Sequence, residues 1–189
     1  MLKFSLSKLV MEFTGTLFLT MFFSTSSSGV ILLGLWILTI FFWKISGSHF
    51  NPAVTFAFMF RKDEHKMPVK IALCYMLAQV LGAFAGALLL NFYTFNLSPL
   101  DYTNTLFFRA LTQEALTSFI YVFFFMTCTD EKLLFSNEKA INCFIIASSY
   151  VGARSMFVGQ SIIATTYGAV SNPAIALGIM MSTLINKGI

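Results

Sequence analysis

The tripeptide Asn-Pro-Ala occurs twice in this chain and divides the sequence into two comparable parts. Each copy is followed by an apolar run, residues 54–60 after the first and 175–181 after the second. Asn is a favoured N-cap, and Pro suits the first helical turn because the N–H that it lacks would have no intrahelical partner there. Each copy therefore predicts the start of a helix. The six candidate site residues are Asn51, Pro52, Ala53, Asn172, Pro173 and Ala174.

The two predicted helices are short for a membrane. About seven residues extend roughly 10 Å at a rise of ~1.5 Å per residue, whereas the hydrocarbon core of a bilayer is ~30 Å thick. Two half-helices at corresponding positions of two repeats are typical of a transport site near the bilayer midplane, where their positive N-termini face the pathway.

Composition places the whole chain in a membrane. The 189 residues are 57% hydrophobic and 11% charged, whereas a soluble domain carries about 25% charged residues. The first apolar stretch contains Glu12 and leads to no small-residue cleavage site, so we expect it to be retained. The basic residues lie in short loops rather than along one face, which argues against a nucleic-acid partner and for the lipid bilayer.

The hydropathy pattern predicts an all-α membrane protein with five full spans and two half-helices in a single domain, residues 1–189. The spans are expected at residues 6–23, 29–45, 68–93 and 106–129, and from about 139 to between 157 and 163. The half-helices are expected at 51–60 and from 172 to about 183. Gly82 and Gly86 have the small-xxx-small spacing that lets two helix backbones approach closely.

A second pattern supports an internal repeat, with the halves at about 1–95 and 104–189. Both halves contain a Glu, a hydroxyl residue four positions later, and two Phe ten and eleven positions later. These residues are Glu12, Thr16, Phe22 and Phe23, and Glu114, Ser118, Phe124 and Phe125. Three spans per half invert the second copy. Because the chain ends at Ile189, about where a sixth span would begin, we expect the second repeat to be incomplete.

The distribution of basic residues predicts a cytoplasmic N-terminus. With that orientation nine Lys and Arg residues lie on the inner side and three on the outer side, as the positive-inside rule requires. The inner residues are Lys3, Lys8, Lys44, Arg61, Lys62, Lys66, Lys70, Lys132 and Lys139, and the outer ones are Arg109, Arg154 and Lys187.

These features resemble the aquaporin, or major intrinsic protein, family. The resemblance rests on residues 46–55 (Ser-Gly-Ser-His-Phe-Asn-Pro-Ala-Val-Thr), on residues 78–83 (Ala-Gln-Val-Leu-Gly-Ala), on Glu12 and Glu114, and on the second Asn-Pro-Ala. It implies an inverted-repeat helical bundle of six spans and two half-helices. It also implies a narrow pore through each subunit and a homotetramer.

The sequence departs from the family pattern at the outer constriction. An Arg ordinarily follows the second Asn-Pro-Ala, whereas this chain has Ile175. Counting from the two Asn residues as the family pattern does, the resemblance places Ile31, Gln160, Ala169 and Ile175 in the constriction. Arg154 is a candidate replacement for the missing Arg, although a helix would place it about 9 Å along and about 120° around from Gln160.

The polar residues of the predicted membrane segments suggest specific roles. The side-chain oxygens of Asn51 and Asn172 should cap the half-helices, which would leave their NH₂ groups to hold a water or hydroxyl oxygen. Glu12 and Glu114 are expected to accept hydrogen bonds from re-entrant loop N–H groups, with a proton relay as the alternative. By resemblance, Gln79 is a neighbour of Glu114. His49 is expected to pack a loop, with a titratable gate as the alternative.

The sequence therefore predicts a passive channel for water or small uncharged solutes such as glycerol, urea or ammonia. The absence of an Arg at position 175 should favour solutes with a hydrocarbon backbone relative to water. The alternative is a non-conducting or structural membrane protein. The two His and three scattered Cys do not supply the convergent groups of an enzyme, so no catalytic residue, metal or cofactor is expected.

Overall fold

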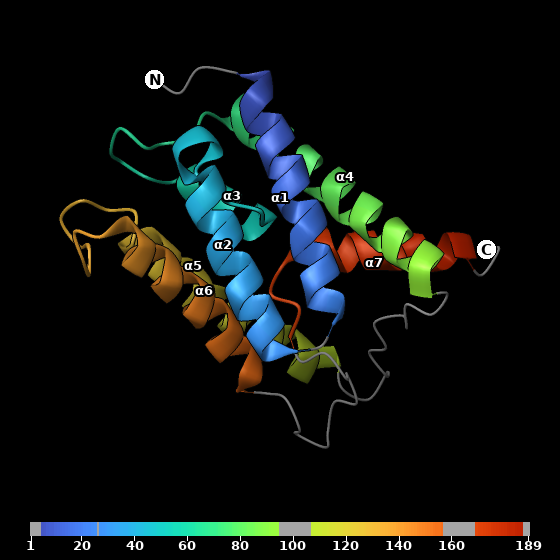
Figure 1. The fold of residues 1–189 in the computed structure, drawn as a ribbon. Helices are drawn as coiled ribbons and strands as arrows, with labels where there is room; N and C mark the ends of the chain where they lie inside the picture. The colour runs from blue at the N-terminus through green and yellow to red at the C-terminus, as the bar shows by residue number, and fades with distance from the viewer. Residues whose placement is uncertain (1–4, 26, 95–106, 157–168, 187–189) are drawn as a thin grey trace.

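The computed structural model describes residues 5–25, 27–94, 107–156 and 169–186, and these segments form seven helices without strands (Figure 1). The all-helical class is therefore confirmed for the described residues. The helices are α1 (Leu6–Ser24), α2 (Ser28–Ser46), α3 (Pro52–Phe58), α4 (Val69–Thr94), α5 (Phe107–Thr127), α6 (Lys139–Ser155) and α7 (Pro173–Asn186).

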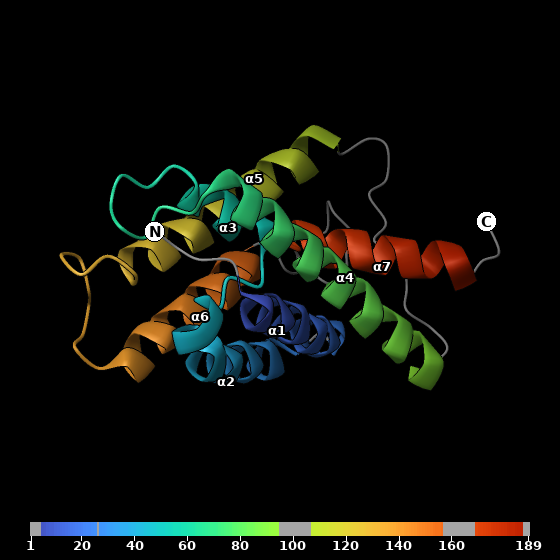
Figure 2. The ribbon, with the colours of Figure 1, turned by 90° about the horizontal axis from the view of Figure 1, so that it is seen from above.

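Two glycines set the close packing of α1 against α4. A Cβ atom on Gly82 would collide with the carbonyl oxygen of Phe13, and one on Gly86 would lie 2.5 Å from the carbonyl oxygen of Leu17. The two helix backbones can therefore touch only because these positions carry no side chain. On its other side α4 packs against α7, which crosses it in both views (Figures 1 and 2).

Helix α6 packs against both α2 and α5. The indole Nε1 of Trp36 in α2 donates to the carbonyl oxygen of Ala140 at 2.9 Å, and its ring meets Phe144 edge-on at 5.2 Å. Tyr121 of α5 and Tyr150 of α6 form a similar edge contact, with ring centroids 5.0 Å apart. These aromatic pairs add specific geometry to the apolar contact between helices.

The outer surface of the bundle is apolar. Large side chains such as Phe41, Phe92 and Phe119 are 67–73% exposed. Four helices, α1, α2, α4 and α5, are long and apolar enough to cross a bilayer. In water such a surface would be an aggregation hazard, so the exposed residues fit a lipid environment.

Two of the predicted elements differ in length from expectation. Helix α6 has 17 described residues, fewer than each of the four helices that are long and apolar enough to span a membrane, and it contains the buried polar residues Asn142 and Arg154. The predicted end of this span, between 157 and 163, lies outside the described residues. Helix α3 has seven residues as predicted, and α7 has 14, ending three residues beyond the predicted end and still too short to span the bilayer.

Candidate pore site

The two re-entrant loops meet inside the bundle immediately before their helices. Phe50 and Ser171 each precede the Asn of a tripeptide, and both have a positive φ, 47° and 51°. Non-glycine residues seldom adopt this conformation, which costs of order 1–3 kcal/mol. The same strained geometry at matching positions of both repeats turns each carbonyl toward the opposite loop.

The side-chain oxygens of the two asparagines cap the helices. Oδ1 of Asn51 accepts from the backbone N–H of Ala53 at 2.8 Å, and Oδ1 of Asn172 accepts from that of Ala174 at 3.0 Å. Both residues are almost fully buried. Each capped helix directs its partial positive charge toward the other loop.

The NH₂ groups of these asparagines were expected from the sequence to be left for a water or hydroxyl oxygen. Each of them instead donates one N–H to the opposite loop. Nδ2 of Asn51 donates to the carbonyl oxygen of Ser171, and Nδ2 of Asn172 donates to the carbonyl oxygen of Phe50, both at 2.8 Å. A primary amide carries two N–H groups, so this exchange uses one N–H on each side. The second N–H of each amide takes no part in this exchange.

Glu12 supports the first re-entrant loop from α1. Its carboxylate accepts from the backbone N–H groups of His49 at 3.1 Å and Phe50 at 2.8 Å, and from Nε2 of Gln79 at 2.8 Å. The expectation that Gln79 lies beside Glu114 is therefore wrong. Gln79 is in α4, which packs on α1, so its amide reaches Glu12 and also donates to Thr55 Oγ1 at 2.9 Å.

Glu114 supports the second loop in the same way from α5. Its two carboxylate oxygens accept from the backbone N–H groups of Val170 and Ser171, each at 2.7 Å. The Ser171 hydroxyl is also hydrogen bonded to that of Thr117 at 2.7 Å. Both glutamates therefore satisfy two consecutive N–H groups that water cannot reach at membrane depth, which supports the loop-acceptor role rather than the proton relay.

His49, in the first re-entrant loop, packs among aromatic rings. Its ring lies 4.3 Å from that of Phe58, 5.6 Å from that of Tyr75 and 5.8 Å from that of Phe125. Its Nδ1 is 3.1 Å from the Thr55 hydroxyl, and the residue is only 2% exposed. These contacts support the packing role more than a gate open to solvent.

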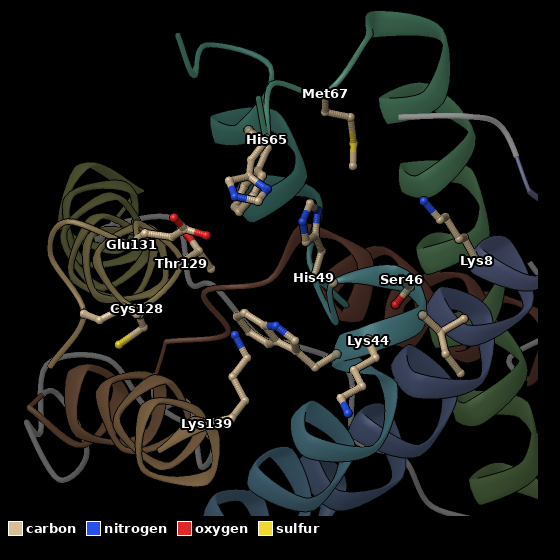
Figure 3. A pocket seen from close by; sticks show the side chains of 15 residues that line it. Lys8, Lys44, Ser46, His49, His65, Met67, Cys128, Thr129, Glu131 and Lys139 are labelled. Atoms are coloured by element: carbon tan, nitrogen blue, oxygen red, sulfur yellow. The ribbon is translucent and has the colours of Figure 1, made fainter. Parts of the chain in front are cut away.

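A cavity of about 450 Å³, hereafter the vestibule, opens at the end of the molecule where α2 ends (Figure 3). No pattern in the sequence predicts this cavity. Its lining comes from α1, α2, the start of α6 and the turns that follow α3 and α5, and the His49 ring points into it (Figure 3). The lining residues are Lys8, Trp43, Lys44, Ile45, Ser46, Gly47, His49, Phe58, His65, Met67, Cys128, Thr129, Glu131, Leu134 and Lys139.

Comparison with known sequences identifies the family. The profile of the family described as "Major intrinsic protein" matches residues 3–106, which is more than half of the chain. The chain belongs to the major intrinsic protein family. It is thus a multi-pass integral membrane protein, consistent with its four long apolar helices.

The chain is also similar to a curated member of the family, the lens fiber major intrinsic protein. It is 56% identical over 46 residues to the proteins of Bos taurus, Oryctolagus cuniculus and Homo sapiens. The match covers 24% of this chain and 16% of each relative, so the chain aligns with only about a sixth of the relatives' length.

The constriction that the family resemblance implies is only partly described. Ile31, Ala169 and Ile175 are buried, at 1%, 2% and 0% exposure, whereas Gln160 lies outside the described residues. Arg154 lies beside this group. Its Nε donates to the carbonyl oxygen of Ala169 at 2.7 Å, and its guanidinium carbon is 4.1 Å from the centroid of the Phe23 ring.

The helical offset of Arg154 from Gln160 does not predict its contact with the second re-entrant loop. That contact joins residues 15 positions apart, and no helical periodicity could predict it. A positively charged side chain is rare in a predicted span and usually faces protein or water rather than lipid. This rarity is the signal that could have pointed to the contact of Arg154.

One group of described side chains could hold a metal ion. Ligand atoms of Glu64, His65 and Glu131 lie within 4.8 Å of one another, and all three side chains are exposed. Nearby, Arg61 forms ion pairs with Asp63 and Asp130, which join the turns that follow α3 and α5. The hydrogen bond from Arg61 lowers the pKa of the Asp63 carboxyl to about 2.

Proposed function

We propose that this protein is a passive channel for water and small uncharged solutes such as glycerol, urea or ammonia. The observation that carries the proposal is the meeting of two Asn-capped helix N-termini, with each amide bound to the other loop. We also propose that two inverted repeats, at about 1–95 and 104–189, form the single channel domain. The domain assembles as a homotetramer with cytoplasmic N-termini.

The electrostatics of this meeting point favour neutral solutes. Two helices aim their positive ends at one place, so a cation or a proton-bearing chain of water meets a barrier there. The remaining amide N–H groups can donate to a water or hydroxyl oxygen. A neutral solute thus gains hydrogen-bond partners without an electrostatic cost.

The outer constriction is proposed to contain Ile31, Gln160, Ala169 and Ile175. Ile175 has an apolar side chain where an Arg would offer fixed N–H donors, so water loses hydrogen-bond partners at the outer constriction. Dehydrating a polar group without replacing its hydrogen bonds is costly. We therefore expect glycerol or urea to pass at least as readily, relative to water, as in a relative with Arg at this position.

The test is permeability in proteoliposomes. Osmotic shrinkage reports water flux, and uptake under a solute gradient reports glycerol and urea flux, with empty liposomes as the control. Wild type should exceed empty liposomes for water and for at least one solute. Ile175→Arg should shift the ratio toward water, and Ile175→Leu is the matched control for a change of side chain without charge.

A groove between α5 and α7 favours a second candidate, a non-conducting or structural membrane protein. The groove has a volume of about 350 Å³, and both Glu114 and Asn172 line it. The second loop therefore borders an opening on the side of the bundle. Folded protein that fails to raise the flux of water, glycerol or urea above that of empty liposomes would support this candidate.

A further inference from the structure

The vestibule combines positive charge from three helices in one confined space. Lys8 of α1, Lys44 of α2 and Lys139 of α6 line it, whereas Glu131 is the one carboxylate among its lining residues. Packing of α2 against α1 and α6 fixes the backbone positions of the three lysines, and the side chains of Lys44 and Lys139 are exposed. The electrostatic potential inside the vestibule is therefore positive, because the fold places lysines of three helices around it.

The amino group of Lys139 is held in position by an aromatic ring. Its Nζ lies 3.4 Å from the centroid of the Trp43 ring, which is a cation–π contact. Trp43 is itself stacked on Phe125, with ring centroids 6.0 Å apart. Figure 3 shows the Lys139 amino group directed into the cavity rather than away from it.

The acidic groups of the two turns offset only part of this charge. The carboxylates of Asp63 and Asp130 form ion pairs with Arg61, which does not line the vestibule. Glu64 lies 3.9 Å from His65 on the exposed side of its turn. Glu131 in the lining and Glu64 beside it are thus the two carboxylates set against the three amino groups.

We propose that the vestibule is a binding site for small anions, such as phosphate or a small carboxylate. Ammonium groups bind such anions through charge-assisted hydrogen bonds. The hydroxyl groups of Ser46 and Thr129 are further donors in the lining, and the apolar side chains of Trp43 and Met67 weaken dielectric screening. A volume of about 450 Å³ accommodates an anion of this size together with water. The site does not depend on conduction through the pore.

The chain contains its own reporter for this site. Trp43 lines the vestibule, and the other of the two tryptophans, Trp36, does not. The experiment measures collisional quenching of Trp43 fluorescence in nonionic detergent, in a Trp36→Phe background that keeps the ring contact with Phe144. Iodide, caesium and acrylamide serve as anionic, cationic and neutral quenchers, and acrylamide corrects for the accessibility of the ring.

Relative to their constants for free N-acetyltryptophanamide, iodide should quench Trp43 about threefold or more better than caesium, because one unit charge at contact in water is worth about one to two times RT. Lys44→Gln and Lys139→Gln should each reduce the quenching constant for iodide, divided by that for acrylamide, by about twofold to threefold. Lys132→Gln is the matched control, because Lys132 is exposed on the same turn as Glu131 and does not line the vestibule. Inorganic phosphate should compete with iodide.

Three results would overturn the proposal. Equal quenching by iodide and caesium, each relative to its constant for free N-acetyltryptophanamide, would show that the vestibule has no charge preference. Phosphate that leaves iodide quenching unchanged would show general attraction of anions without a binding site. A loss of iodide preference in Lys132→Gln as large as in Lys139→Gln would assign the effect to the whole basic surface. None of these results bears on water flux in liposomes, so the proposed channel function is tested separately.

Discussion

Asn51 and Asn172 are each hydrogen bonded to the loop that carries the other, through Nδ2 to carbonyl contacts of 2.8 Å to Ser171 and Phe50. The exchange is reciprocal, so the two re-entrant loops hold one another at the centre of the bundle. Each asparagine also caps its own helix through Oδ1. A single side chain thus fixes both the start of a helix and the distance between the two repeats.

Replacing Asn172 with Asp should weaken the exclusion of cations more than replacing it with Ala. The carboxylate retains the cap but places a negative charge where two positive helix ends meet, and so lowers the barrier to a cation. The measurement is potassium flux in proteoliposomes, with Asn51→Asp and Asn51→Ala as the matched pair in the other repeat. Potassium flux in the Asp variants no higher than in the Ala variants would contradict this account of the barrier.

Glu114→Gln should lie between wild type and Glu114→Ala in thermal stability. Both carboxylate oxygens accept a backbone N–H, so Gln retains one acceptor and presents an NH₂ group to the other donor. Each buried donor left unpaired costs roughly 1–3 kcal/mol. The measurement is the loss of soluble monodisperse protein on heating in detergent. A Gln variant as stable as wild type would show that one acceptor is sufficient for the second loop.

Gly82→Ala should destabilise the protein, whereas Gly152→Ala should leave it unchanged or slightly more stable. A Cβ on Gly82 would collide with the Phe13 carbonyl, while one on Gly152 meets no atom within 4 Å. Overpacking costs about 1–3 kcal/mol, and replacing a helical Gly with Ala gains roughly 0.5–1 kcal/mol. The same heating assay measures both variants. Equal stability of the two would show that α1 and α4 can separate without cost.

Arg154→Leu should raise the permeability to glycerol relative to water. The guanidinium of Arg154 is buried beside the predicted constriction and donates to the Ala169 carbonyl, so its removal takes away a fixed donor and a charge. Arg154→Lys is the matched variant, which keeps the positive charge but lacks the planar guanidinium with its fixed N–H donors. Folded Arg154→Leu protein with the wild-type permeability ratio would leave Ile175 or Gln160 as the residue that sets selectivity.

The sequence by itself determined the elements of this protein. The repeated Asn-Pro-Ala predicted two helix starts because capping and proline geometry act within a few residues of the chain. Hydropathy located α1, α2, α4 and α5 to within two residues of their observed ends, since the burial of apolar side chains in lipid is a local property of each segment. The repeated spacing of a Glu, a hydroxyl residue and two Phe identified Glu12 and Glu114, because such a spacing can be seen within each half of the sequence.

Only the tertiary structure decided which side chains meet across these elements. Gln79 reaches Glu12 because two glycines let α4 approach α1, and Arg154 reaches Ala169 because α6 ends beside the second loop. The vestibule likewise unites Lys8, Lys44 and Lys139, which are far apart in the sequence. Periodicity predicts the face of a helix on which a residue lies, whereas its partner depends on packing between helices, which a single sequence does not encode in any local pattern.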